Sequence, residues 1–236
     1  MTTLTPKQQE IRDREAQILA VARPIVVHEG YHGLNMDRIA EEVQYSKGTI
    51  YNHFSCKEEI VIALAVENVN KRFELFQKAA QFKGSPRFRM LAIGAAAELF
   101  VRNSTDFFHF ERILDLPSVL EKTSEKRQSI IRGCETQCMS VVAGIVRDAI
   151  AAGDLELPKR FTPEKLVFGL WSLTNGAYSI ALSSESLQQM GIKDPFETVR
   201  DHTAALLDGF NWQPLSTDYD TKKILKKISK EVFSDE

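Results

Sequence analysis

Two short helical segments joined by a very tight connection constrain this chain more than any other feature. Residues 36–43 and 47–54 each show helical spacing of apolar side chains, after the N-cap residues Asn35 and Ser46. An isolated helix of about eight residues is marginal in water, so both segments need a third helix to pack against. The apolar stripe predicted over about 8–29 supplies that helix. The sequence therefore predicts a three-helix head of the helix-turn-helix type, whose last helix can enter the major groove of DNA.

The second short segment carries side chains suited to DNA on the face that the core leaves free. Ile50 and Phe54 stand four residues apart and face the core. The outward positions carry a cation, a hydroxyl, a phenol and an amide, which suit phosphate oxygens and base edges: Lys47, Thr49, Tyr51 and Asn52. Gly48 lets the backbone approach the groove, and Lys57 adds a cation beside free helix N–H groups.

These residues resemble the TetR family of transcriptional regulators. The matching stretch is Ile39–Glu59, and its most specific part is the run SKGTIYNHF, Ser46–Phe54, followed by Lys-Glu-Glu at 57–59. The resemblance covers about residues 11–65, and beyond them only the helical layout and the total length agree. Two positions depart from the family's usual pattern: Gln44 stands where Gly is common, and Tyr45 where a small aliphatic residue is common. Tyr45 is expected either to be partly buried or to reach the DNA backbone.

The resemblance implies an all-α fold, with a helix-turn-helix head followed by a helical bundle for ligand sensing and dimerisation. It also implies a DNA-facing set, in which Asn35 caps its helix near the DNA and the others hold bases or phosphates: Asn35, Ser46, Lys47, Gly48, Thr49, Tyr51, Asn52, His53 and Lys57. The expected domains are the DNA-binding head over 8–56, the ligand-sensing and dimerisation region over 57–213, and a polar tail over 214–236. The tail carries a weakly amphipathic stretch at about 219–233.

Helical periodicity dominates the rest of the chain, and no run of alternating β-branched residues stands out. Ser55 and Glu58 have the spacing of a capping box, which predicts the start of a long helix ending near residue 82. Segment 103–126 is mixed, with a break at Pro117. The other predicted helices cover about 86–102, 127–152, 163–184 and 195–210.

Composition gives no global sign of a nucleic-acid partner. The chain has 30 basic and 32 acidic residues, and residues 7–60 alone hold seven basic and nine acidic side chains. DNA binding therefore requires local segregation of charge. A helical ligand carrier or adaptor, whose head binds protein, is the alternative that this acidic balance favours.

Other classes of protein find no support in the sequence. It shows no membrane span and no signal peptide, so a cytoplasmic protein is expected. Neither catalytic motifs nor metal-ligand spacing of the five histidines appears, so we expect no enzyme, no cofactor and no metal. Cys134 and Cys138 lie four apart on one helical face, where core packing is favoured over redox sensing.

The larger region is expected to bind a small-molecule effector. An apolar cavity with a few polar contacts is predicted from this set, with ordinary core packing as the alternative: Glu98, Phe107, Phe108, His109, Phe110, Trp171, Asn175 and Tyr178. Helices 162–184 and 195–210 carry apolar residues over wide arcs. The resemblance implies that they build a homodimer, whose two heads would read a palindromic operator from successive major grooves about 34 Å apart. The chain is therefore predicted to be a ligand-responsive repressor.

Overall fold

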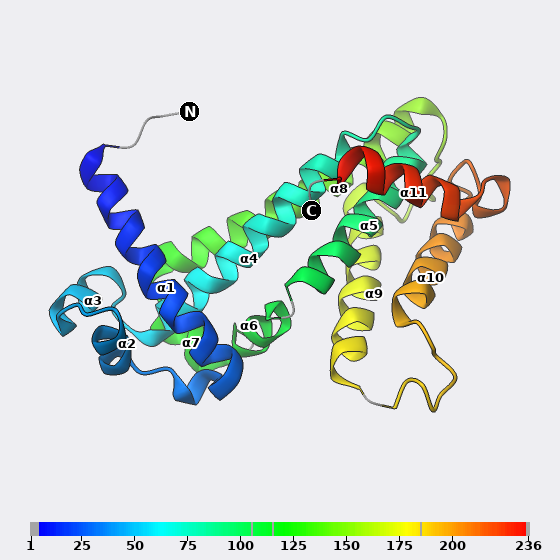
Figure 1. The fold of residues 1–236 in the computed structure, drawn as a ribbon. Coiled ribbons are helices and arrows are strands. Elements are labelled where there is room, and N and C mark those ends of the chain that lie inside the picture. The colour runs from blue at the N-terminus through cyan, green and yellow to red at the C-terminus, as the bar shows by residue number, and fades with distance from the viewer. Residues whose placement is uncertain (1–4, 105, 115, 185, 235–236) are drawn as a thin grey trace. The chain divides into compact units, whose positions relative to one another are not determined.

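The computed structural model describes residues 5–104, 106–114, 116–184 and 186–234, and every regular element within them is helical (Figure 1). This confirms the predicted all-α class. The elements are α1 (Pro6–Gly33), α2 (Met36–Glu42), α3 (Lys47–His53), α4 (Lys57–Ala80), α5 (Pro86–Asn103), α6 (Phe107–Leu114), α7 (Pro117–Lys122), α8 (Glu125–Ala152), α9 (Pro163–Ser183), α10 (Pro195–Gly209), the 3-10 turn η1 (Ser216–Asp218) and α11 (Thr221–Val232). No described helix combines the length and the apolar character that a membrane crossing requires.

The chain folds into two compact units. The first joins residues up to Asn70 to Ser104–Cys134, and the second joins Lys71–Asn103 to Glu135 and the residues after it. The helix-turn-helix head is part of the first unit. Its core is apolar, and Ile18, Ile39 and Ile50 are fully buried where α1 packs on α2 and α3.

The long first helix changes direction at a glycine rather than at its proline. Pro24 lies inside α1, whereas Gly30 has φ 72° and ψ −176°, a backbone conformation that only glycine adopts readily. Three more residues then complete the helix before Leu34, which is buried. The first helix, predicted over about 8–29, therefore continues past a break at Gly30 to Gly33.

Polar side chains tie residues 104–134 to the head. Arg23 of α1 pairs with Glu67, at 2.7 Å, and also with Asp106. Three further contacts add to this: Lys122 with Glu58 at 3.3 Å, Arg127 with Glu15 at 3.2 Å, and the amide of Ser124 with Glu59 at 3.4 Å. The compact units therefore divide the chain differently from the predicted boundary at residue 56, which was drawn by function and stays a prediction.

The start of α4 differs from the predicted capping box. Glu58 is 3% exposed and accepts a hydrogen bond from the hydroxyl of Tyr31 at 2.5 Å. Glu59 instead reaches back, and its Oε2 accepts from the amide of Ser55 at 3.0 Å. The predicted pairing of Ser55 with Glu58 is wrong, because the hydroxyl of Tyr31 from α1 engages that carboxylate instead.

The second unit is a helical bundle to which the C-terminal segment adds a helix. Within this unit α10 packs along α9, and α11 lies against α5 (Figure 1). Ile228 of α11 is fully buried, as is Trp212 in the segment before it. The weakly amphipathic stretch expected at 219–233 therefore folds as α11, because its apolar stripe finds a surface to cover.

Candidate nucleic-acid interface

The turn before α3 is held by local hydrogen bonds. Ser46 caps the helix, and its Oγ accepts from the amide of Thr49 at 3.1 Å. Gln44 has φ 58°, the left-handed conformation for which Gly is better suited. The hydroxyl of Tyr45 donates to Oε1 of Gln17 in α1 at 2.5 Å. Of the two expectations for Tyr45, the structure therefore favours partial burial, with the ring tying the turn to α1.

The free face of α3 carries the side chains expected to meet DNA. Tyr51 is 50% exposed, whereas Ile50 and Phe54 on the opposite face are fully buried. Exposed positions surround Tyr51, and Thr49 is partly exposed; they are Ser46, Lys47, Gly48 and Asn52. The phenol of Tyr51 stays in solvent and gains nothing from packing in the core. A role in binding is therefore the better explanation for a tyrosine at this position.

Gly48 leaves this face open. A Cβ atom built there meets only Oγ of Ser46, at the ordinary contact distance of 3.8 Å. The protein itself therefore does not require glycine at this position. A partner that approaches the backbone closely does require it.

The cations near this face are paired with carboxylates of the head. Nζ of Lys47 lies 2.6 Å from Oδ2 of Asp37, and this hydrogen bond raises the pKa of Lys47. Arg38 contacts Glu29 at 2.7 Å and Glu42 at 2.9 Å. The hydrogen bond from Arg38 lowers the pKa of Glu29. The face therefore presents directed polar groups rather than a surplus of positive charge.

Two residues of the expected DNA-facing set have other contacts, whereas Asn35 forms the predicted helix cap. The side chain of His53 is only 9% exposed, with Nδ1 3.9 Å from Glu15, so its imidazole does not join the face of α3. Nζ of Lys57 donates to the carbonyl of Tyr31 at 3.1 Å and lies 4.1 Å from the centre of that ring. Asn35 caps α2 by accepting from the amide of Asp37 at 2.8 Å.

Two residues outside the expected DNA-facing set, Asp37 and Tyr31, also shape this site. Asp37 forms an ion pair with Lys47. Its position in the first turn of α2, near the turn before α3, is the sequence signal that could have indicated this pair. Tyr31 links Lys57 to Glu58, and burial together with the hydrogen bond to Glu58 raises the pKa of Tyr31 to about 12. Tyr31 and Glu58 are 27 positions apart, so their hydrogen bond leaves no local pattern in the sequence.

The expected effector residues fall into both units. Four lie on α6 in the first unit, where Phe107, Phe108 and Phe110 are buried and His109 is exposed. The guanidinium of Arg23 lies 5.4 Å from the centre of the Phe110 ring, so this ring belongs to the packing around α1. The other four lie in the second unit: Glu98, Trp171, Asn175 and Tyr178.

Two small apolar hollows lie beside α5 in the second unit, where larger and more polar grooves are also present. The outer hollow, about 40 Å³, is lined by Tyr178, Arg200, Tyr219 and Leu225 among others. The inner hollow, about 70 Å³, is lined by residues that include Trp171. Glu98 pairs with Arg200 and with Arg102 rather than lining either one, and Asn175 lines neither. Burial, with Glu98 nearby, raises the pKa of Tyr178.

Comparison with known proteins identifies the head. The sequence model described as "Bacterial regulatory proteins, tetR family" matches residues 18–64, which include all of α2 and α3. The chain belongs to the TetR family. Members of this family are DNA-binding transcriptional regulators and not enzymes, so the adaptor alternative gives way to DNA binding.

Relatives of this TetR-family chain extend beyond the head. The fatty acid metabolism regulator protein of Bacillus subtilis is 22% identical over 188 residues, which are 76% of this chain and 94% of that protein. The HTH-type transcriptional activator FasR of Mycolicibacterium smegmatis is 30% identical over 93 residues, 39% of this chain and 42% of FasR. A TetR/AcrR-family regulator from Thermobifida fusca superposes with a TM-score of 0.58 at 24% identity, covering 84% of this chain and 98% of the other. That superposition shows a common fold.

Proposed function

We propose that this TetR-family chain is a ligand-responsive repressor that binds a palindromic operator as a homodimer. The observation that carries the DNA-binding surface is the two-faced character of α3. Tyr51 stays 50% exposed while Ile50 and Phe54 are fully buried. Polar side chains that a fold leaves in solvent on a helix-turn-helix are available for bases and phosphates.

The proposed contacts follow the chemistry of each exposed side chain. Asn52 can form paired hydrogen bonds with an adenine edge, and Thr49 can meet a base or a phosphate. Tyr51 and Lys47 suit phosphate oxygens, and Gly48 allows the backbone to come close. Ser46 and Asn35 hold the helix starts that present these groups, and Lys57 joins them once it leaves the carbonyl of Tyr31.

The proposed homodimer rests on an apolar face of α9 that this chain does not cover. Phe168 is 59% exposed, Ile180 56% and Trp171 42%. Small or polar residues lie between them on the exposed side of the helix, at Ser172 and Gly176. Large apolar side chains grouped on one helix favour a self-complementary contact with a second copy.

The effector and the direction of regulation are part of the same proposal. The Bacillus subtilis relative regulates fatty acid metabolism, and the hollows of the second unit have apolar walls, which together favour a small apolar effector. A dimer that occupies a promoter blocks transcription without any further contact, so repression is the simpler outcome. Release requires that the effector binds the non-DNA-binding arrangement more tightly.

Substitution of two exposed residues tests the DNA surface. We expect Tyr51→Ala and Lys47→Ala each to weaken binding to the chain's own upstream palindrome by about tenfold or more, because each removes a hydrogen bond to a charged phosphate, worth about 1.5–3 kcal/mol. Gel-shift titration measures the affinity, and melting and sedimentation should stay unchanged. Met190→Ala is the control, because Met190 is 70% exposed and lies outside the head. Unchanged DNA affinity in both variants would refute the assignment.

A reporter under the same promoter tests the direction of regulation. Expression of the chain should lower the reporter signal, and the Tyr51→Ala variant should not. A higher signal with the chain than without it would replace repression by activation and leave DNA binding intact.

A further inference from the structure

The two hollows of the second unit share a wall. The same four residues line both of them: Met90, Gly94, Thr174 and Thr203. At about 40 and 70 Å³ each hollow is small beside the roughly 300–1,000 Å³ of a ligand pocket. Separately, neither accommodates an effector. Joined across this wall, they would form one longer passage of about 110 Å³ beside α5, and its lining must still move apart to admit an effector.

The wall between the hollows includes a glycine and a flexible methionine, Gly94 and Met90. A Cβ atom built on Gly94 meets nothing within 4 Å, so open space lies against the backbone of α5 there. Met90, one turn earlier, has an unbranched side chain that changes rotamer easily. A rotation of Met90 is therefore the smallest movement that connects the two hollows.

The outer hollow is roofed by the C-terminal segment. Tyr219 and Leu225 line it, and they come from the stretch that follows α10. The ring of Tyr219 stands edge-on to Phe88 of α5, with centroids 5.0 Å apart. These two contacts are apolar, so the part of the roof that carries Tyr219 and Leu225 can move without breaking a hydrogen bond of its own.

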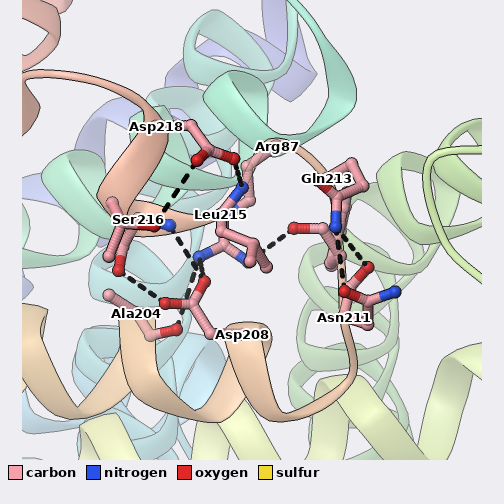
Figure 2. Close-up of polar contacts among 10 residues, drawn as sticks. Arg87, Ala204, Asp208, Asn211, Gln213, Leu215, Ser216 and Asp218 are labelled. Atoms are coloured by element: carbon pink, nitrogen blue, oxygen red, sulfur yellow. Dashed lines mark hydrogen bonds and ion pairs between the residues drawn. The ribbon is translucent and has the colours of Figure 1, made fainter.

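A buried arginine fastens this roof at one end. Arg87 of α5 is 2% exposed and donates to the carbonyls of Trp212 and Ala204, each at 3.3 Å, and to Asp208 at 2.6 Å (Figure 2). Asp208 in turn accepts from the amide of Ser216 at 3.1 Å and from its hydroxyl at 2.5 Å. We call Arg87, Asp208 and Ser216 the latch.

We propose that the two hollows are the ends of one slot for an unbranched alkyl chain, and that residues 212–233 are the lid over its outer end, fastened by the latch. This inference rests on the proposed effector binding and adds its shape class and its route of entry. A narrow passage with apolar walls takes an extended methylene chain better than a compact or branched ligand. Entry lifts Tyr219 and Leu225 and moves Met90 aside.

A pair of probes tests the shape of the slot. We expect calorimetry of the full chain to detect dodecanoate, and to show affinity lower by about tenfold or more for adamantane carboxylate, a compact cage with the same head group. Equal affinity for the two probes, or no binding of dodecanoate, would overturn the slot.

Substitutions at Gly94 locate the probe. Gly94→Leu fills the open space beside α5 and should lower the affinity for dodecanoate by about tenfold or more. Gly94→Ala is the matched control and should retain the affinity, since it adds only a methyl group. Neither variant should melt lower than the parent, because Leu and Ala form helix better than Gly. Parental binding by Gly94→Leu would contradict the proposed path.

The lid is tested with tryptophan fluorescence. Trp171→Phe leaves Trp212 as the only tryptophan, and Trp212 is fully buried beside the latch. Dodecanoate should shift its emission to the red and increase its quenching by acrylamide. Binding that calorimetry detects while Trp212 stays unchanged would exclude movement of the lid.

The latch is tested by rates. Ser216→Ala removes one hydrogen bond to Asp208 and should raise the association rate of dodecanoate by about fivefold, as loss of about 1 kcal/mol implies. Thr217→Ala, the exposed neighbour, should leave the rate unchanged. Gel shifts with the parent chain and the same variants separate the two proposals. A chain that binds the operator but not dodecanoate overturns only the slot. A parent chain that does not bind the operator overturns the proposed regulator.

Discussion

Lys47 illustrates how a single carboxylate can govern a DNA-facing cation. Both side chains of the Lys47–Asp37 pair are largely exposed, at 63% and 49%, so the pair contributes little to folding stability. Its effect lies on binding, because a phosphate must compete with Asp37 for the ammonium group. The pair thereby limits attraction to DNA of any sequence and leaves discrimination to the neutral donors and acceptors of α3.

Asp37→Asn should therefore bind non-specific duplex DNA more tightly. We expect the slope of log K against log salt to steepen by about one, because one more cation reaches a phosphate. Fluorescence anisotropy over a salt series measures both quantities. Glu42→Gln is the control, since it faces Arg38 and not Lys47. An unaltered salt slope in Asp37→Asn would show that Asp37 does not restrain Lys47.

A substitution at Gly30 tests the cost of backbone strain without a steric clash. Its φ of 72° favours glycine, yet a Cβ atom there meets nothing within 4 Å. Gly30→Ala should therefore lower the free energy of unfolding by about 1–3 kcal/mol through backbone strain alone. Gly133→Ala in α8 also meets nothing within 4 Å, has no left-handed backbone, and should instead stabilise. Urea unfolding of both variants compares the signs, and destabilisation by both would contradict the argument.

At the scale of elements, most helices could be predicted because helical periodicity and capping are local signals. The helix predicted over 163–184 is observed as Pro163–Ser183, with Thr162 as its cap and Pro163 in the first turn. The mixed reading of 103–126 conceals two short helices, α6 and α7, on either side of the break near Pro117. Short helices with one or two turns carry too few repeats to stand out.

Long-range polar pairs were beyond the sequence. Arg23 meets Asp106 across 83 positions, and Arg87 meets Asp208 across 121. No local spacing announces such partners, because they depend on how helices pack. The same reason explains why α6 aromatics were grouped with the effector residues: their composition suits a cavity and a core equally well. In α3, by contrast, the alternation of apolar and polar positions was itself the signal.

The Arg87–Asp208 pair predicts how the C-terminal segment responds to substitution. Asp208→Asn leaves the guanidinium of Arg87, 2% exposed, without its counter-charge. We expect a loss of about 2–4 kcal/mol in the free energy of unfolding, because the uncompensated charge stays buried. Asp148→Asn removes the partner of Arg89, an exposed carboxylate on α8, and should change stability by less than about 1 kcal/mol. Chemical denaturation measures the free energy of unfolding of both variants. Equally small losses in the two would show that the latch does not stabilise the fold.

The pH dependence of this pair has a definite sign. Burial raises the pKa of Asp208, but hydrogen bonds from Ser216 and the charge of Arg87 outweigh it and lower the pKa overall. The stabilisation is therefore present above the unfolded pKa of about 3.9 and is lost as pH falls through the lower, folded value. Parent and Asp208→Asn should converge in stability in that acidic window. A difference that stays constant down to the acid transition would exclude this linkage.

At the scale of the whole molecule, the proposed regulator depends on a second copy. A single head offers few contacts, and two heads on one palindrome roughly add their binding free energies. The exposed side of α9 provides the apolar side chains for such a pairing, with Phe168 the most exposed of its large aromatic residues at 59%. In a two-fold contact each substitution acts twice, because the same face is present on both copies.

Phe168→Asp should therefore convert a dimer to a monomer. The carboxylate would be buried twice in an apolar contact, a cost of several kcal/mol that exceeds what one lost aromatic contact implies. Sedimentation velocity measures the change in mass. Operator affinity should fall with it, while thermal unfolding of the full chain stays cooperative. Met190→Asp places the same charge at a position 70% exposed outside α9 and should leave the dimer intact. A Phe168→Asp chain that sediments as the parent does would move the dimer contact away from α9, and the two-headed reading of a palindrome would then need a different surface to hold the heads in register.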